Sequence, residues 1–380
     1  MTSINCVDLN QLADDIKRWG KELGFQYTGI ADIDLSKHES RLTDWLEKGY
    51  HGEMHFMEEH GLKRARPSEL LPGTLRVISV RLNYLPPDAS FAQHLSDPNI
   101  GYISRYALGR DYHKVLRKKL KHLGKKIEAQ VPGIVFRPFT DSAPVLEHAL
   151  AEKAGSGWTG KHTLTLSKDG GSWFFLGELF VNLPLPTDTE VEENCGECTA
   201  CITMCPTQAI VAPYTVDARK CISYLTIEYD GVIPEDYRPL IGNRIYGCDD
   251  CQLVCPWNRY AHITEESDFF ARKTLHGQTL STLFSWDEKT FLKNTEGNPI
   301  RRIGFQKWSR NLVIAMGNAP YSKETIQLLE NRLHNTTEMV ATHIKWALTQ
   351  QHNKANQYKE MTRHTGRLVR IVEKGLPRDA

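Results

Sequence analysis

The sequence predicts an α+β protein of several domains, and three observations carry this prediction. Helical and strand patterns alternate in the first 180 or so residues, eight of the nine cysteines lie within 195–255, and helical periodicity dominates 280–351. The expected divisions are an α/β domain over 1–182, a small cysteine-rich domain over 183–262 and a helical region over 263–380.

The N-terminal elements follow from periodicity and from the residues that end them. Residues 9–24 place apolar side chains at helical spacing and stop at Gly24, and residues 75–82 (LRVISVRL) form a β-branched, apolar run typical of a buried strand. The other expected elements are strands over 25–33, 133–139 and 172–181, and helices over 41–48, within 101–122 and around Glu147 and His148.

The C-terminal part is expected to be helical. Helices are predicted over 283–291, 303–316, 323–333 and 338–348. Paired helices at an interval of about 35 residues favour a short HEAT-like array. Residues 354–380 carry seven Lys or Arg against three acids, and this tail either folds on RNA or stays disordered.

Composition excludes several classes of protein. No apolar stretch approaches the roughly 18 residues of a membrane span, and no N-terminal apolar segment of a secretory signal is present, so a cytoplasmic protein is expected. The 47 basic and 46 acidic residues leave a formal net charge of +1, which points to no nucleic-acid or membrane partner. Local charge is uneven, because 113–126 contain seven Lys or Arg and no acid. That helix is either a solvated face or an RNA phosphate contact.

The cysteines form two runs, C-x2-C-x2-C-x3-C-P from Cys195 and C-x2-C-x3-C-P from Cys248, with Cys221 between them. The first run is that of bacterial ferredoxins, in which the cysteine before the proline ligates the other cluster. Eight thiolates match two [4Fe–4S] clusters. The expected ligand sets are Cys195, Cys198, Cys201 and Cys255 for the first cluster, and Cys205, Cys221, Cys248 and Cys251 for the second.

Other uses of these cysteines fit less well. A zinc ribbon uses two C-x2-C pairs, whereas both runs here end in x3-C-P. A disulfide framework needs an oxidising compartment, which nothing in the sequence indicates. Cys6 is expected to be an ordinary thiol near the terminus.

Two clusters conduct electrons, so the rest of the chain must bind a group that uses them. No G-x-G-x-x-G follows a strand and no G-x4-G-K-[ST] phosphate loop is present. The D-x-H-x-x-G histidine signature of some cobalamin enzymes is met by Asp111 and His113 but fails at Leu116. Asp141 follows a predicted strand, where α/β sheets place chemistry; it also fits a helix N-cap, and the sequence leaves both readings open.

Several segments together resemble the epoxyqueuosine reductases, over nearly the whole chain. They are 101–113 (GYISRYALGRDYH), 139–147 (FTDSAPVLE), the glycine-rich loop 154–162, the two cysteine runs and 219–228 (RKCISYLTIE). The resemblance implies a nitroreductase-like α/β domain that binds cobalamin, a two-cluster ferredoxin-like domain and a HEAT-like end that binds tRNA. It also implies the last step of queuosine synthesis, the two-electron removal of the epoxide oxygen of epoxyqueuosine at the tRNA wobble position.

The resemblance assigns roles to particular residues. Asp141 matches the family's proton donor, and as a general acid it is expected to have a pKa raised by burial against the corrin and an apolar wall. Cobalamin is expected base-off, without a histidine ligand. The expected cobalamin contacts are Asp141, Gly160, Lys161 and His162, with Tyr106, Arg64 and Ser223 as further members of the pocket.

The resemblance also implies partners. The substrate is a tRNA with a GUN anticodon, and the electron donor is a flavodoxin or ferredoxin system; the chain is expected to be a monomer. Two alternatives remain open, a corrinoid and iron–sulfur reductive dehalogenase and a non-catalytic electron-transfer subunit. The expected RNA contacts are 114–126, Arg301, Arg302 and the basic residues of the C-terminal tail.

Overall fold

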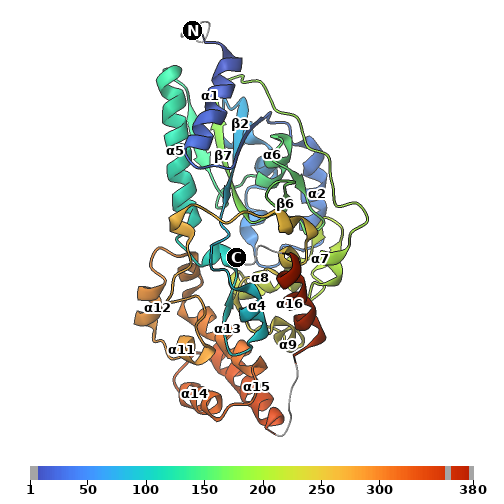
Figure 1. The fold of residues 1–380 in the computed structure, drawn as a ribbon, viewed down its shortest axis with the longest axis vertical. Helices are drawn as coiled ribbons and strands as arrows, with labels where there is room; N and C mark the ends of the chain where they lie inside the picture. Colours follow the sequence, from blue (N-terminus) through green and yellow to red (C-terminus); the bar gives the residue numbers. More distant parts are fainter. Residues whose placement is uncertain (1–6, 356–360, 376–380) are drawn as a thin grey trace.

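A computed structural model describes residues 7–355 and 361–375, so Cys6 lies outside the described residues. The molecule is elongated, with an α/β part at one end, the helices α13–α15 at the other and the cysteine segment between them (Figure 1). The α/β part is built on a four-stranded sheet of order β1-β2-β7-β4, in which every neighbouring pair is antiparallel. The strands are β1 Tyr27–Ala31, β2 Arg76–Asn83, β4 Phe136–Phe139 and β7 Phe174–Val181.

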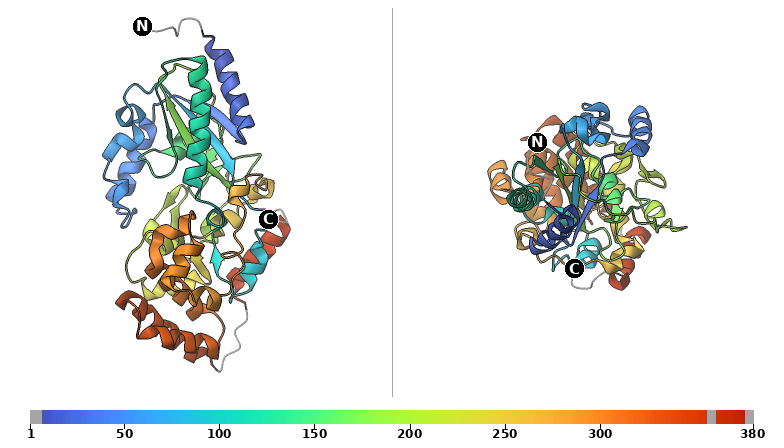
Figure 2. Two further views of the ribbon diagram at one scale, coloured as in Figure 1. Left: turned by 90° about the vertical axis from the view of Figure 1, so that its left-hand side faces the viewer. Right: turned by 90° about the horizontal axis from the view of Figure 1, so that it is seen from above.

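Helices cover both faces of this sheet. α1 (Leu9–Glu22) and α5 (Tyr112–Gln130) pack together on one face, and α6 (Glu147–Lys153) packs on the other (Figure 2). Because successive strand residues point to opposite faces, β7 gives Phe175 to the core beneath α5 and Glu178 to the side of α6. This alternation determines which side chains meet at the end of the sheet.

The helices α1 and α5 are amphipathic and have side-chain caps at their N-termini. In α5, Leu116, Leu120, Leu123 and Ile127 recur at helical spacing and are all fully buried. The Asp111 side chain caps this helix by accepting a hydrogen bond from the backbone N–H of residue 113. The helix lies close to β7 at Gly177, where a Cβ atom would be 3.0 Å from Leu116 and Leu120.

A second apolar core lies in the other half of the molecule. It contains residues of 103–108, of 218–245 and of α13 (Gly304–Asn318) and α15 (Glu338–Lys354), which pack closely together with α14 (Lys323–Leu333). The parallel pairing of β3 (Tyr102–Ile103) with β10 (Arg244–Tyr246) joins distant segments there. This core draws on all three predicted domain ranges, and the three-domain division stays a prediction.

The remaining elements are shorter. The further strands are β5 (Trp158–Thr159), β6 (Thr165–Leu166), β8 (Ile210–Ala212) and β9 (Thr215–Val216). The further helices are α2 (Ser36–Glu47), α3 (Pro67–Leu70), α4 (Phe91–Ser96), α7 (Ala200–Thr203), α8 (Ile222–Ile227), α9 (Arg238–Ile241), α10 (Asp250–Leu253), α11 (Leu280–Phe284), α12 (Glu288–Asn294) and α16 (Arg363–Gly375). None of the helices described here is both long and apolar enough to cross a membrane.

Two expectations about the C-terminal half are wrong. The single helix expected over 283–291 is two helices, α11 and α12, because Asp287 accepts a hydrogen bond from the Thr290 N–H (2.8 Å) and starts a new helix. The tail was expected to be disordered or to fold on RNA, but within it α16 packs on α4 and α10 of this same chain. Leu368 and Val372 of α16 are buried in the core that contains α4.

Candidate active site

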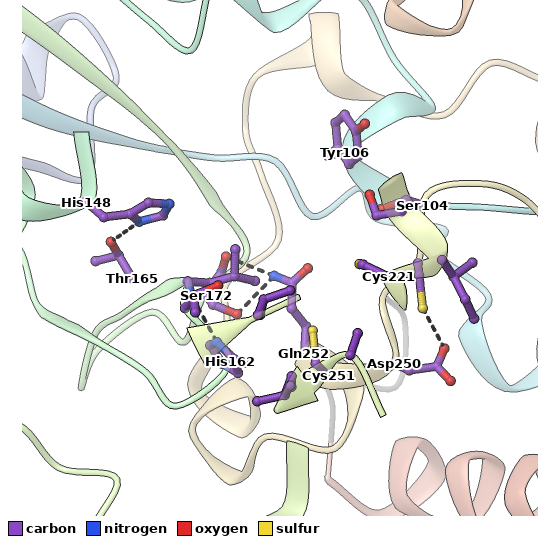
Figure 3. Close-up of a pocket in the computed structure, with 18 of the residues that line it drawn as sticks. Ser104, Tyr106, His148, His162, Thr165, Ser172, Cys221, Asp250, Cys251 and Gln252 are labelled. Carbon is purple, nitrogen blue, oxygen red and sulfur yellow. Dashed lines mark hydrogen bonds between the residues drawn. The ribbon is translucent and has the colours of Figure 1, made fainter. Parts of the chain in front are cut away.

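A main cavity of about 380 Å³ lies between the end of the sheet and the cysteine segment (Figure 3). Its cysteine end is formed by Cys205, Cys221, Cys248 and Cys251, and its acid end by Asp141 and Glu147. Figure 3 shows Cys221 and Cys251 across the cavity from His148. The walls between the two ends include the apolar side chains Leu164, Phe174, Phe175, Leu176, Ile210, Val216 and Ile222.

The other four described cysteines line a second cavity of about 310 Å³. These are Cys195, Cys198, Cys201 and Cys255, and Cys198 is exposed at the surface. None of the eight cysteines that the structure describes is in a disulfide. Each cavity therefore combines cysteines from both runs of the sequence.

Asp141 stands at the end of β4, in a loop that leads to α6. The first residue of α6 is Glu147 and its N-cap position is Leu146, so the N-cap reading of Asp141 is wrong. The backbone of Asp141 has φ +53°, a left-handed conformation that aspartate tolerates better than most residues. Its N–H donates a hydrogen bond to the Glu147 carboxyl group. The loop thus turns the Asp141 side chain, which is 57% exposed, to the rim of the cavity.

The first turn of α5 holds the Asp141 carboxylate. The Tyr112 hydroxyl donates to Asp141 Oδ2, and His113 Nε2 lies 3.1 Å from the same oxygen. The Tyr112 ring is stacked between the His113 ring and the Phe175 ring, each with its centroid 4.1 Å away. The other ring nitrogen of His113, Nδ1, lies 2.7 Å from Asp111 Oδ1. His113 therefore bridges two carboxyl groups.

These contacts determine where the protons reside. Desolvation by the surrounding protein disfavours the charged form of Asp141, but hydrogen bonds from His113 and Tyr112 outweigh it and lower the pKa of Asp141 below its ordinary value. Among the protein's own groups, these hydrogen bonds oppose the expected rise of the Asp141 pKa, and the part of that expectation that rests on burial against the corrin stays a prediction. Burial also disfavours the charged His113, but hydrogen bonds to Asp111 and Asp141 raise the pKa of His113 to about 9. At neutral pH the pair is an imidazolium beside a carboxylate.

A pair of carboxyl groups, those of the half-buried Glu147 and the buried Glu178, lies next to Asp141. Burial, with the Asp141 charge, raises the pKa of Glu147 to about 8. Burial and the neighbouring Glu147 raise the pKa of Glu178 well above its ordinary value. The Ser79 hydroxyl lies 3.4 Å from Glu178 Oε1. Glu178 was not predicted as a site residue, although an acid inside the apolar run 174–181 is a usable signal.

Two arginines fasten the Asp141 loop. Arg64, expected to contact cobalamin, is buried; its guanidinium donates to the Phe56 carbonyl (2.7 Å) and the Ala143 carbonyl (3.4 Å). It is not among the residues that line the main cavity. Arg117 of α5 donates to the Ser142 hydroxyl. Arg64 can therefore influence the cavity through the loop.

The other expected cobalamin contacts are divided between the two cavities. Tyr106 and Ser223 line the main cavity, and His162 lines both. Lys161 lines only the second cavity, and its Nζ donates to the carbonyls of Gly196 and Cys198. Gly160 lines neither cavity.

Contacts with neighbouring residues of this chain explain why position 160 is a glycine. A Cβ atom at this position would lie 2.7 Å from Leu166 Cδ1 and 2.9 Å from the His162 ring. Any larger residue would displace the His162 ring.

His162 has an unmatched hydrogen-bonding atom. Its Nδ1 accepts from the Leu164 N–H (3.1 Å), so Nε2 carries the proton in the neutral ring. Burial lowers the pKa of His162 to about 4, which keeps the ring neutral. Nε2 is buried and has no hydrogen-bond partner among the described residues. Buried donors are rarely left unpaired, so a group that accepts from Nε2 fits here.

The basic residues of α5 divide into paired and unpaired ones. Lys119, Lys125 and Lys126 form ion pairs with Glu266, Glu128 and Glu22. Lys114, Lys118 and Lys121 are exposed and form no ion pair within the described residues. At their spacing they form one stripe that begins one residue after His113.

The expected RNA contacts in the second half of the chain are engaged with other groups. Arg301 donates to the Leu292 carbonyl (2.8 Å). Arg302 forms an ion pair with Glu228.

Comparisons with known proteins cover the whole site. Residues 64–142 match the family model "Epoxyqueuosine reductase QueG, DUF1730", and 194–258 match "4Fe-4S double cluster binding domain". The epoxyqueuosine reductase of Vibrio cholerae is 62% identical over 374 residues, which are 98% of this chain and 100% of that protein.

Two solved structures are also similar. One is an epoxyqueuosine reductase crystallised with a tRNA-Tyr epoxyqueuosine-modified stem loop (TM-score 0.84, 26% identity, 96% of this chain and 100% of that one). The other is a Bacillus subtilis epoxyqueuosine reductase with its catalytic aspartate loop swung out of the active site (TM-score 0.83, 25% identity, 97% and 100%).

Proposed function

This chain belongs to the epoxyqueuosine reductase family, and we propose a route for its reduction of epoxyqueuosine to queuosine at the wobble position of tRNA. The reaction consumes two electrons and two protons, breaks both C–O bonds of the epoxide and releases its oxygen as water. The observation that carries the route is the continuous main cavity, which has four cysteines at one end and Asp141 at the other.

Electrons reach the cavity through two [4Fe–4S] clusters. The first is held by Cys195, Cys198, Cys201 and Cys255, and the second by Cys205, Cys221, Cys248 and Cys251. The grouping of these cysteines round two cavities supports the sets, as does the two-cluster family match. The exposed Cys198 makes the first cluster the entry point for a flavodoxin or ferredoxin donor.

Cobalamin is the group proposed for the space between the cysteine end and the acid end. The apolar walls suit a large flat ring, and the unpaired Nε2 donor of His162 suits a polar substituent on such a ring. When bound, cobalamin supplies a redox-active cobalt centre at the epoxide. Tyr106, His162 and Ser223 would contact it, while Gly160, Lys161 and Arg64 would act by shaping the surrounding loops.

Asp141 is the proposed proton donor to the epoxide oxygen. It stands on the rim, where a nucleoside inserted from the tRNA would reach it, and Tyr112 and His113 fix the orientation of its carboxyl group. The loop swung out in the Bacillus subtilis protein supports an aspartate loop that moves with substrate. The hydrogen bonds that Arg64 and Arg117 donate to this loop would then favour its inward position.

The exposed lysines of α5 are proposed to contact the tRNA backbone. Their stripe begins beside the Asp141 loop, so phosphates flanking a bound wobble nucleoside would meet it. The C-terminal helices, proposed to be HEAT-like, and the basic side of α16 would extend this surface. The enzyme is proposed to be a monomer of the cytoplasm. A tRNA substrate favours neither a dehalogenase nor a pure electron-transfer subunit.

Anaerobic turnover tests this proposal. Reduced protein with both clusters and added cobalamin is incubated with epoxyqueuosine-containing tRNA, which is then digested to nucleosides. Queuosine should form only when reductant and cobalamin are both present. Equal queuosine from corrinoid-free protein would contradict the role of cobalamin, and no queuosine from the complete protein would contradict the reaction.

A further inference from the structure

The proposed reaction delivers two protons to one oxygen atom, and this requirement leads to a second residue. Opening the epoxide places the first proton on its oxygen, and loss of that oxygen as water needs the second. A carboxyl group carries one proton at a time, so Asp141 must be reprotonated between the two transfers. The inference below rests on the proposed function and identifies the group that reprotonates Asp141.

His113 has the geometry of a proton donor to Asp141. Its Nε2 lies 3.1 Å from Asp141 Oδ2, and its Nδ1 lies 2.7 Å from Asp111 Oδ1. A carboxylate at each nitrogen means that both nitrogens carry hydrogen, which is the imidazolium form. Asp111 is itself fixed as the N-cap of α5, and the stacked Tyr112 ring holds the imidazole plane.

The other titratable groups near the His113–Asp141 pair either hold their protons more firmly than His113 does or make no contact with the Asp141 carboxylate. Burial raises the pKa of Tyr112 well above its ordinary value, so this phenol stays neutral. Arg302, whose pKa is raised by its contact with Glu228 against the effect of burial, stays charged. The Arg64 guanidinium donates to the backbone carbonyls of Ala143 and Phe56 and has no hydrogen bond to the Asp141 carboxylate among the described residues.

The acids and the second histidine near the pair are also separate from it. Glu147 accepts a hydrogen bond from the Asp141 backbone N–H and contacts Glu178, so its carboxyl group is engaged away from the Asp141 carboxylate. Burial lowers the pKa of His148, which is therefore neutral and bonded to Thr165. Among the described residues, His113 is the group that combines a transferable proton with contact to the Asp141 carboxylate.

We propose that His113 stores the catalytic proton and passes it from Nε2 to Asp141 Oδ2, from which it moves to the epoxide oxygen. After the transfer His113 is neutral, Asp141 is again a carboxylate, and His113 recovers a proton from water before the second transfer. Asp111 keeps the Nδ1 proton in place throughout. His113 is thus a positioning residue that acts through Asp141 and does not contact the substrate.

The proposal makes a specific prediction about pH. In the wild type the pair retains one proton up to a pH near 9, so the single-turnover rate should be flat between about pH 5.5 and 8. His113→Gln can still donate a hydrogen bond but cannot release a proton at these pH values. Asp141 would then have to bind its proton directly from solvent, so the rate should rise about tenfold for each pH unit of acidification. At pH 7.5 the deficit should be at least about 100-fold.

The test uses the protein with both clusters and cobalamin, pre-reduced and mixed with epoxyqueuosine-containing tRNA at each pH. His262→Gln, an exposed histidine outside the site, is the matched control and should follow the wild type. A deficit in His113→Gln that is the same at every pH would assign His113 a structural role only and overturn the proposal. A wild-type rate in His113→Gln would overturn it as well.

A second readout does not depend on activity. The titration of His113, followed by NMR of histidine-labelled protein, should occur near pH 9 in the wild type and at clearly lower pH in Asp141→Asn. An unchanged titration in Asp141→Asn would contradict the coupled pair. Because this measurement needs no substrate, it separates failure of the pair from failure of the proposed reaction.

Discussion

The cysteine end and the acid end of the main cavity are assembled in different ways. Cys248 and Cys251 come from one short run, joined by Cys205 from the other run and by Cys221 between them. Asp141 forms hydrogen bonds with Tyr112 of α5 and Glu147 of α6. Glu147 in turn contacts Glu178 of β7. The residues of the cysteine end can be recognised from their spacing along the chain, whereas those of the acid end are recognised only from tertiary packing.

This difference has a functional meaning. In the proposed route the cysteine end carries electrons and depends on the number of thiolates, so removing one ligand should abolish cluster binding at that end. The acid end would deliver protons and depend on orientation and on neighbouring charges, so single changes there should alter rates and pH dependence. The predictions below test this contrast, from the largest effect to the smallest.

Cys205→Ser tests the cysteine end and should have the largest effect. Loss of one thiolate should remove the second cluster, so iron should fall from about eight to about four per chain and queuosine should become undetectable. Cys6→Ser, which alters the cysteine assigned to neither cluster, is the control and should keep full iron content. Retention of eight irons by Cys205→Ser would remove that residue from the ligand set.

Glu178→Gln tests the carboxyl pair at the acid end. The pKa of Glu147 is raised from 4.5 to about 8 in the folded protein, so its contribution to stability is complete below pH 4.5 and is lost as pH rises through 8. Wild-type thermal stability should therefore decline across this range. Glu178, whose own pKa is raised well above its ordinary value by burial and by Glu147, adds to this decline, and Glu178→Gln removes its titration. The variant should therefore be a few degrees more stable relative to wild type at pH 9 than at pH 5.

Thermal unfolding at several pH values measures this effect. Glu324→Gln, which alters an exposed acid of α14, provides the control and should decline as the wild type does. If Glu178→Gln declined as steeply as the wild type, the two glutamates would not be coupled.

Lys118→Ala and Lys121→Ala test the basic stripe and should have the smallest effects. Each should weaken tRNA binding a few-fold and reduce the slope of log affinity against log salt by about 1. Lys48→Ala, which alters an exposed lysine at the end of α2 and outside the proposed tRNA surface, is the control and should bind tRNA as the wild type does. An unchanged slope for both stripe variants would mean that the lysines beside the acid end do not contact phosphate.

The sequence predicted what is local in the chain. Buried strands such as 75–82, the helical periodicity of α5 and the spacing of the cysteines are short-range patterns, and the structure contains the corresponding elements. The resemblance to the family, carried by motifs such as 101–113, was confirmed by the relatives at 56–62% identity.

What the sequence could not predict depends on packing between distant segments. Asp111 and His113 attracted attention as an incomplete D-x-H-x-x-G signature, but their partner Asp141 lies 28 residues beyond His113. The predicted rise in the Asp141 pKa took account of burial and omitted the hydrogen bonds from α5, which lower this pKa in the folded chain. Lys161 was placed on cobalamin, whereas its ammonium group is bound to backbone carbonyls of the first cysteine run.

The contrast between the two ends is tested most directly by the single-turnover rate of Asp141→Asn. Pre-reduced wild type and variant, each with measured iron and corrinoid content, are mixed with epoxyqueuosine-containing tRNA, and queuosine is followed over time. Iron and corrinoid should be unchanged in the variant, while the rate should fall about 10²- to 10⁴-fold, because a proton donor is lost and the electron path is kept. A variant that forms queuosine at the wild-type rate would contradict the assignment of Asp141 and of the acid end.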